Sequence, residues 1–513
     1  MTYSPYFFEL LCISGMSTYT RHTPEKTVLY QVLARTWPGV VRDYREAEEK
    51  ISRHVLTEFD RYFRCGILQH GFVWLKCPKC DLERVVAYSC KCRGICFSCN
   101  ARRMEQTANR IEQEVWPLTA STRQWVLSFP FQVRYWLARN PELLGAVNKA
   151  VCQEISDFYE KNISSQLRLM NGSQATLPEV GTGAISFVQF FGSALNLTPH
   201  LHILFMDGGW IRDKKGFRFI PVNGFTSESM FEVIYGMLSR LDLVFKAFGY
   251  VRDDGEGEEP ELSEDIPLPF KPRSPKAYRR RGRSPDHPDY KQTDPNKISI
   301  QGWCNVKFKW FSLHAGVTIK AEDRFGLKKL IRYTSRSAVS PSRLSYVDAA
   351  NPETSEVKLT LKKSWGDGTS ELTFSQQTFT EKIAEIIPPT WFNLTRYHGI
   401  FAPGHAWRDF IVPGPKKKRY RCDEDVPPPK ACASKGSRAI GEYWAPWAEL
   451  MTKTFGIDPE ICLCGAKMVV QKCITDAEGI AAMMTKLGLS GTPPPLGRVK
   501  GQSGELSYLF DGE

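Results

Sequence analysis

The sequence of 513 residues has no run of about eighteen apolar residues, the length that a membrane-spanning helix needs. Its first segment, Met1 to Ile13, is briefly apolar, but it lacks the basic residues and the small-residue cleavage site of a signal peptide. No internal repeat is visible. We therefore expect neither a transmembrane helix nor an export signal.

The composition is that of a folded protein with a basic surface. Hydrophobic residues make up 42% and aromatic residues 12% of the chain, which is enough for several buried cores. A chain of this length corresponds to about three or four domains. The net charge of +12 favours a polyanionic partner, nucleic acid before membrane, although many ordinary proteins are mildly basic.

Cysteine is plentiful and clustered. Of fifteen cysteines, seven lie between Cys65 and Cys99. Without an export signal, such clustering indicates metal binding in a reducing compartment. Two C-x2-C knuckles predict one structural zinc site made of Cys77, Cys80, Cys96 and Cys99. The nearby Cys65, His70, Cys90 and Cys92 are left open as residues that support the zinc ligands, as buried thiols or as a second site.

Arg102 and Arg103 directly follow the second knuckle. A metal-pinned turn flanked by arginines suits contact with DNA phosphates. A module that binds another protein is the alternative.

Two histidines mark a second candidate site. His200 and His202 flank Leu201 at the start of an apolar stretch that reads as a strand. Residues two apart on a strand point to the same face, so both imidazoles can hold one divalent metal. The alternative is a pair of histidines packed in a sheet.

Tyr333 lies in a predicted helix among four basic residues, Lys328, Lys329, Arg332 and Arg336. A phenol with an ordinary pKa near 10 is a poor nucleophile, and positive charge nearby favours the phenolate and holds a phosphate. The alternative is an ordinary helix aromatic at the surface.

Composition shifts divide the chain into six segments. We expect an N-terminal helical region, a zinc-binding domain, a large domain that carries the histidine pair and Tyr333 with a flexible insertion at about 250–298, a basic linker, a small cysteine-containing unit and a loose tail. The expected ranges are 1–60, 61–105, 106–412, 413–438, 439–489 and 490–513.

The order of these motifs resembles the rolling-circle transposases of the IS91 type, including the ISCR elements, which are His-hydrophobic-His nucleases. The resemblance covers roughly residues 60–480. It rests on Cys65-Gly66, Cys77 to Cys80, Ser89 to Lys91, Cys96 to Arg103, Arg123 to Pro130, Phe191 to His202, Phe311 to Ala315, Leu330 to Arg336 and Leu394 to Pro403.

The resemblance implies an α+β fold, with an antiparallel nuclease sheet flanked by helices and a small zinc ribbon. It implies Mg²⁺ or Mn²⁺ on His200 and His202, and attack by Tyr333 on single-stranded DNA at an element end. The products would be a 5′-phosphotyrosine and a free 3′-OH. Trp125, Phe190 and Tyr397 are candidate stacking platforms, and the protein would work in a prokaryotic cytoplasm, at the nucleoid.

In related folds a neighbouring strand supplies a third metal ligand. Gln189 is the first candidate and His314 the second, while Asp207 should face the opposite side of the sheet. Some family members carry a second tyrosine four residues before the first, where this chain has Lys329, so it resembles the single-tyrosine kind. The Cys462-Leu-Cys464 knuckle is one residue short of C-x2-C, so no zinc is assigned there.

Three other functions fit parts of this pattern. A relaxase or rolling-circle replication initiator would use the same site, but the cysteine knuckles before the nuclease core favour transposition. A non-enzymatic zinc protein that binds DNA would need neither the histidines nor Tyr333. An inactive transposase copy is the third.

Overall fold

The computed structural model describes residues 23–172, 177–214, 216–222, 225–250, 270, 298–300, 302–414, 447–455 and 458–494. The expected insertion, most of the basic linker and most of the tail lie outside these residues. Within the described ranges, no helix is both long and apolar enough to cross a membrane.

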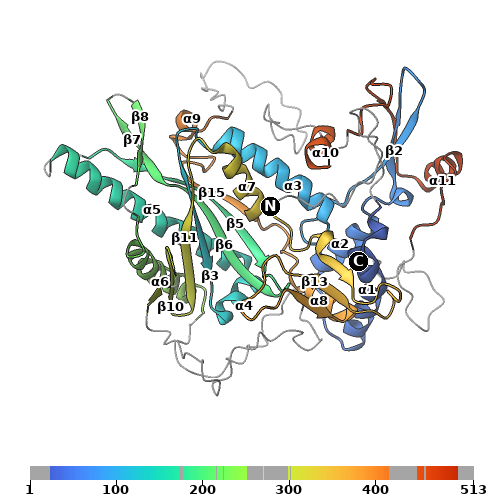
Figure 1. The fold of residues 1–513 in the computed structure, drawn as a ribbon, viewed down its shortest axis with the longest axis horizontal. Coiled ribbons are helices and arrows are strands. Elements are labelled where there is room, and N and C mark those ends of the chain that lie inside the picture. Colours follow the sequence, from blue (N-terminus) through green and yellow to red (C-terminus); the bar gives the residue numbers. More distant parts are fainter. Residues whose placement is uncertain are drawn as a thin grey trace, which may run out of the picture.

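A seven-stranded antiparallel sheet forms the centre of the molecule (Figure 1). Its strand order is β15-β5-β6-β3-β11-β10-β9. The strands are β3 (Thr122–Ser128), β5 (Gly183–Phe191), β6 (Leu197–Met206), β9 (Ser299–Ile300), β10 (Asn305–Phe308), β11 (Phe311–Ile319) and β15 (Thr395–Gly399). The predicted α+β class with an antiparallel sheet is confirmed.

Helices cover both faces of this sheet. On one face, alternate residues of β3 and β6 pack against α5 (Pro141–Asn171) and α6 (Ser229–Ala247). On the other face, Phe187 and Leu204 pack against α7 (Arg324–Thr334), and α3 (Phe97–Arg110) lies beside α7. Because both faces are buried, β5 and β6 are apolar almost throughout, and a polar residue inside either strand is therefore informative.

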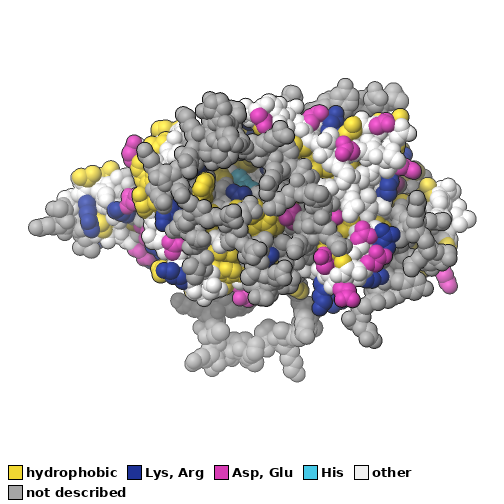
Figure 2. Space-filling view, turned by 90° about the horizontal axis from the view of Figure 1, so that it is seen from below, with side chains coloured by type: hydrophobic (Ala, Val, Ile, Leu, Met, Phe, Trp, Pro, Cys, Tyr) yellow, Lys and Arg dark blue, Asp and Glu magenta, His cyan; other side chains and the backbone are white. Residues whose placement is uncertain are grey.

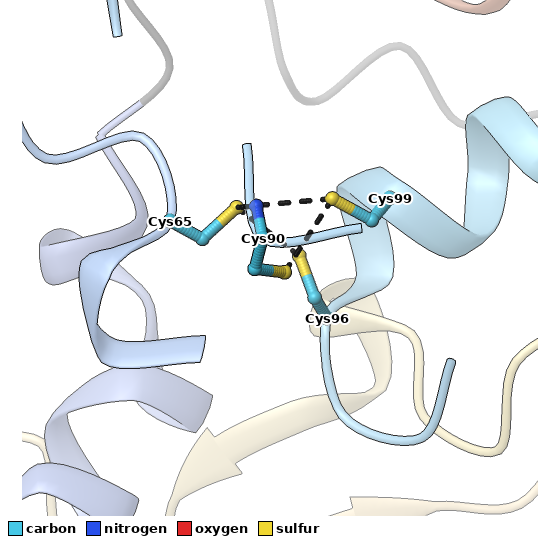
Figure 3. A group of neighbouring side chains, drawn as sticks. All are labelled: Cys65, Cys90, Cys96 and Cys99. Carbon is cyan, nitrogen blue, oxygen red and sulfur yellow. Dashed lines mark hydrogen bonds between the residues drawn. The ribbon is translucent and has the colours of Figure 1, made fainter. Parts of the chain in front are cut away.

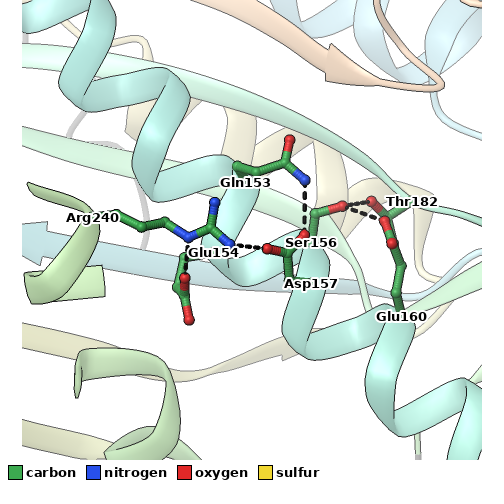
Figure 4. A network of polar contacts seen from close by, with 7 residues as sticks. All are labelled: Gln153, Glu154, Ser156, Asp157, Glu160, Thr182 and Arg240. Atoms are coloured by element: carbon green, nitrogen blue, oxygen red, sulfur yellow. Dashed lines mark hydrogen bonds and ion pairs between the residues drawn. The ribbon is translucent and has the colours of Figure 1, made fainter. Parts of the chain in front are cut away.

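Ion pairs fix α6 to α5 on the first face (Figure 4). The guanidinium of Arg240 on α6 reaches Glu154 and Asp157, one turn apart on α5. Gln153 donates to Asp157 over 2.8 Å, so the carboxylate has a second partner. This network stiffens the face opposite α7.

The N-terminal helices belong to a second packing unit. α1 (Val28–Glu46) and α2 (Arg53–Arg64) share a core with β12 (Leu344–Tyr346), β13 (Val357–Thr360), β14 (Glu371–Phe374) and α8 (Gln376–Glu385). Between α1 and α2 the chain breaks at a polar stretch where Glu48 has a φ of 57°. That left-handed conformation cannot continue an α-helix.

The cysteine-rich region is built on a hairpin. β1 (Phe72–Lys76) and β2 (Glu83–Ala87) pair with each other, and β16 (Val469–Ile474) pairs with β1 from the C-terminal unit. α11 (Ala477–Lys486) follows β16 in the C-terminal unit, and α10 (Trp447–Phe455) lies against α3. The remaining elements are α4 (Phe131–Arg139), β4 (Val180–Gly181), β7 (Gly208–Asp213), β8 (Gly216–Pro221) and α9 (Arg408–Ile411).

Candidate active site and metal centres

The two histidines lie side by side on β6, on the face that α7 covers. His200 stands opposite Ser128 of β3 and Gln189 of β5. His202 stands two residues further along β6, opposite Val126 and Phe187. The ring centroids of the two imidazoles are 5.0 Å apart. The strand alternation therefore brings both rings to one face, as the sequence predicts.

Hydrogen bonds orient both rings. The Nδ1 of His200 donates to the backbone oxygen of Thr198 over 2.8 Å, which leaves its Nε2 with a free lone pair. The Nδ1 of His202 lies 2.9 Å from the side-chain amide nitrogen of Gln124. If the Gln124 amide rotates by 180°, its oxygen accepts a hydrogen bond from the protonated Nδ1, and the Nε2 of His202 then has a free lone pair as well.

Burial keeps both imidazoles neutral. It lowers the pKa of His200 and the pKa of His202 below the ordinary value, and the positive charge of Arg336 lowers both further. Only a neutral imidazole can bind a metal. The pair is therefore in the protonation state that ligation requires at neutral pH.

Gln189 supplies an oxygen suited to the same site. Its side-chain nitrogen donates to the backbone oxygen of Thr334 over 2.7 Å, at the end of α7. Its Oε1 is buried, with no hydrogen-bond partner among the described residues. A buried oxygen without a partner is costly unless something absent from the structure binds it. Two imidazoles and this amide oxygen form a donor set that fits a divalent cation.

The other two candidate ligands lie elsewhere. His314 is on β11 and pairs with Val126, which separates it from His202 by one whole strand. Two strand spacings correspond to about 10 Å. Asp207 lies on the opposite face, as expected, where its carboxylate binds Arg123 over 2.8 Å and accepts from the hydroxyl of Tyr159.

α7 carries Tyr333 over the histidine pair. Asp323 caps the N-terminus of the helix, since its carboxylate accepts a hydrogen bond from the backbone nitrogen of Gly326. Leu327 and Ile331 bury one side of the helix against the sheet. The Tyr333 ring lies edge-on to His202 at a centroid distance of 5.8 Å and keeps 47% of its surface exposed. The structure thus brings together an exposed phenol and two neutral imidazoles from segments about 130 residues apart.

The first thiol cluster joins Cys65, Cys90, Cys96 and Cys99 (Figure 3). Their sulfurs lie 3.5–3.8 Å apart where they approach one another most closely. Four sulfurs around one zinc at the usual bond length would stand about 3.8 Å apart. The cluster therefore fits one tetrahedral zinc ion.

This grouping corrects the predicted zinc site. The two knuckles do not meet, because the β1–β2 hairpin carries Cys77 and Cys80 at its tip, while Cys96 and Cys99 lie near its base. A five-residue strand separates tip from base by about 16 Å. The tip thiols gather instead with Cys462 and Cys464 of the C-terminal unit.

Comparison with known families gives two matches. Residues 36–129 match the family described as "Transposase zinc-binding domain", and residues 183–408 match the family described as "Putative transposase". The first match spans the cysteine hairpin and the second spans the histidine pair and Tyr333. The chain is an IS91-type transposase. Neither the curated proteins nor the solved structures contain a match.

Two of the predicted DNA-binding cations on α7 have a different partner in this transposase. Lys328 and Arg332, one turn apart, both bind the buried carboxylate of Glu105 on α3, at 3.0 and 2.6 Å. That they also contact DNA stays a prediction. They tie the tyrosine helix to the helix that leaves the first thiol cluster.

The arginines after the second knuckle are also engaged. Arg102 contacts the sulfur of Cys99 at 3.4 Å. Arg103 donates to the backbone oxygen of Lys91 over 2.7 Å and to Asn100. Both side chains therefore hold the cysteine region together, a role that their sequence position does not reveal.

The remaining cations gather at Tyr333. The guanidinium of Arg336 lies 5.1 Å from the Tyr333 ring centroid, and its buried Nε has no partner among the described residues. Lys329 is exposed on α7. Lys362, which no sequence motif marks, joins them: its ammonium lies 6.0 Å from the same centroid. Partial burial, Arg336 and Arg343 lower the pKa of Lys362 to about 8.

Two of the expected stacking platforms are core residues. Trp125 and Phe190 are buried against α5 and its neighbours, so neither can meet a DNA base. Figure 2 shows a hollow near the middle of one face of the molecule, with histidine and basic side chains visible inside it. Phe131 is 44% exposed and begins α4, three residues after Ser128, the cross-strand neighbour of His200.

Proposed function

We propose that this transposase nicks single-stranded DNA at the ends of its element by metal-dependent transesterification, with Tyr333 as the nucleophile. The approach of the Tyr333 ring to His202, on the face that also holds His200 and Gln189, carries the proposal. The products would be a 5′-phosphotyrosine and a free 3′-OH that primes rolling-circle replication.

His200, His202 and the Oε1 of Gln189 would hold Mg²⁺ or Mn²⁺. When bound, such an ion polarises the scissile phosphate and offsets the charge that develops on it. The buried, unpartnered Oε1 and the neutral imidazoles support this assignment.

The bond changes involve only the phenol and one phosphodiester. The Tyr333 hydroxyl loses its proton, its oxygen bonds to phosphorus, and the bond from phosphorus to the 3′ oxygen breaks. The 3′ oxygen takes up a proton and leaves as a hydroxyl. Arg336 and Lys362 stand where they can stabilise the phenolate and hold the phosphate.

A single strand is the expected substrate because the site is enclosed. α7 lies over the histidine pair, so a flexible strand can enter where a rigid duplex would be held away. Phe131 can stack on an unpaired base at the edge of the site. Because its substrate would be chromosomal DNA, we expect the protein to act at the nucleoid of a prokaryotic cytoplasm.

Oligonucleotides that cover the element ends test the substrate. With Mn²⁺ present, the single-stranded form should be cleaved, and protein should stay bound to the new 5′ end of the downstream fragment. The blunt duplex should stay intact. Equal cleavage of both forms, or cleavage that leaves no bound protein, would contradict the proposal.

Measured metal affinities decide whether Gln189 or His314 is the third metal ligand. We expect Gln189→Ala to weaken Mn²⁺ binding at least about tenfold, since one ligand is lost, and Gln189→Glu to retain binding. His314→Ala is the control and should leave affinity unchanged. Calorimetric titration with Mn²⁺ gives the affinities. A weaker site in His314→Ala and an unchanged one in Gln189→Ala would reverse the assignment.

The pH profile of nicking tests Lys362. The neutral amine of Lys362 becomes populated as the pH rises through about 8. If this amine accepts the proton of the Tyr333 hydroxyl, the nicking rate should rise through the same pH. Lys362→Arg keeps the positive charge but cannot lose its proton in this range. We expect the step near pH 8 to disappear in this variant, measured as single-turnover rates between pH 6 and pH 9. An unchanged profile would limit Lys362 to charge stabilisation.

A further inference from the structure

A second thiol cluster joins two segments that lie far apart in the chain. The sulfurs of Cys77 and Cys464 lie 3.5 Å apart, and those of Cys80 and Cys462 lie 3.4 Å apart. All four ligand atoms lie within 4.8 Å of one another. A disulfide needs a separation of about 2.05 Å, so these are free thiols at the spacing of a tetrahedral metal site.

Both thiol pairs sit in tight turns that aim their sulfurs inward. In the hairpin, the backbone nitrogen of Lys79 donates to the sulfur of Cys77 over 3.4 Å, and Asp81 has a φ of 58°. In the C-terminal unit, the backbone nitrogen of Gly465 donates to the oxygen of Cys462 over 2.9 Å, and Gly465 has a φ of 81°. The shorter C-x-C spacing therefore still forms a knuckle.

The C-terminal unit depends on the hairpin for its fold. β16 pairs along the whole of β1, and Arg84 donates to the backbone oxygens of Pro459 and Ile461. Its small apolar contacts are made with the hairpin region, where Ile474 and Met484 pack against Phe72. Residues 458–494 are too few to build a core alone, and a structural metal is the usual remedy for such a segment.

We propose that Cys77, Cys80, Cys462 and Cys464 bind a second structural zinc ion, which fastens the C-terminal unit to the zinc-binding hairpin. Four thiolates in a closed site favour zinc over harder cations. Cys462 and Cys464 lie beyond both matched regions, so neither match assigns them a role.

Zinc content of the full chain tests the proposal independently of nicking. Native mass spectrometry should show two zinc ions per chain, and one in the Cys462→Ser/Cys464→Ser double variant. Cys473→Ser is the matched control, because Cys473 is an exposed thiol of the same unit outside the cluster, and it should retain two. One zinc ion in the unaltered chain, or two in the double variant, would overturn the proposal.

Hydrogen exchange gives a second readout. Loss of the clamp should raise the exchange of β16 and α11 while the central sheet remains protected. Unchanged exchange in the double variant would contradict the fastening role. Because neither measurement involves DNA, failure here is distinguishable from failure of the nicking mechanism.

Discussion

Tyr333→Phe should abolish strand cleavage and covalent attachment to DNA. The substitution removes only the attacking oxygen, since the ring keeps its contacts with His202 and Arg336. Removing a nucleophile lowers rates by about a thousandfold or more. The measurement is a single-turnover nicking assay with Mn²⁺ on a single-stranded element end.

Tyr235→Phe is the matched control for this prediction. Tyr235 is similarly exposed, at 52%, but lies on α6 across the sheet, and its loss should leave nicking unchanged. The Tyr333→Phe protein should still bind the oligonucleotide and retain its zinc. Cleavage at the normal rate in Tyr333→Phe would remove the tyrosine from the mechanism.

Cys99→Ser should cause the largest loss of stability. Structural zinc in small cysteine sites contributes on the order of 10 kcal/mol of binding free energy, which is comparable with the stability of a whole domain. Cys99 lies in the first turn of α3, and α3 holds α7 through Glu105. We expect loss of zinc from the first cluster, a lower melting temperature and loss of nicking together.

The control for Cys99→Ser comes from the same segment. Cys92 is a buried thiol outside the cluster, and its sulfur contacts the backbone oxygen of Glu58. Cys92→Ser should keep the zinc and most of the activity. Zinc content measured by mass spectrometry, with melting followed by circular dichroism, separates the two variants. Equal zinc content in both would contradict the assigned ligand set.

Local patterns in the sequence are sufficient to predict much of the candidate active site. β5, Gly183–Phe191, is mostly apolar and is followed by a glycine and a loop, a local pattern that is typical of a buried strand. The period of a strand placed His200 and His202 on one face, and Asp207 on the other. These features depend on neighbours a few residues away, and such neighbours are visible in a sequence.

Contacts between segments that lie far apart in the chain could not be predicted from local patterns. The spacing of Cys77 and Cys80 relative to Cys96 fits a single zinc site, and only the hairpin geometry shows that the knuckles stand apart. Nothing in the sequence joins Cys77 to Cys464, which lies 387 residues away. Likewise, helical spacing puts Lys328 and Arg332 on one face of α7 without revealing that Glu105 lies opposite.

The most direct measurement is peptide mapping of the covalent complex. After reaction with a single-stranded element end and Mn²⁺, protease digestion and mass spectrometry should locate the nucleotide on the α7 peptide, joined to Tyr333 through a 5′-phosphate. A nucleotide on another residue, one joined through its 3′ end, or nicked DNA without any attached peptide would contradict the account.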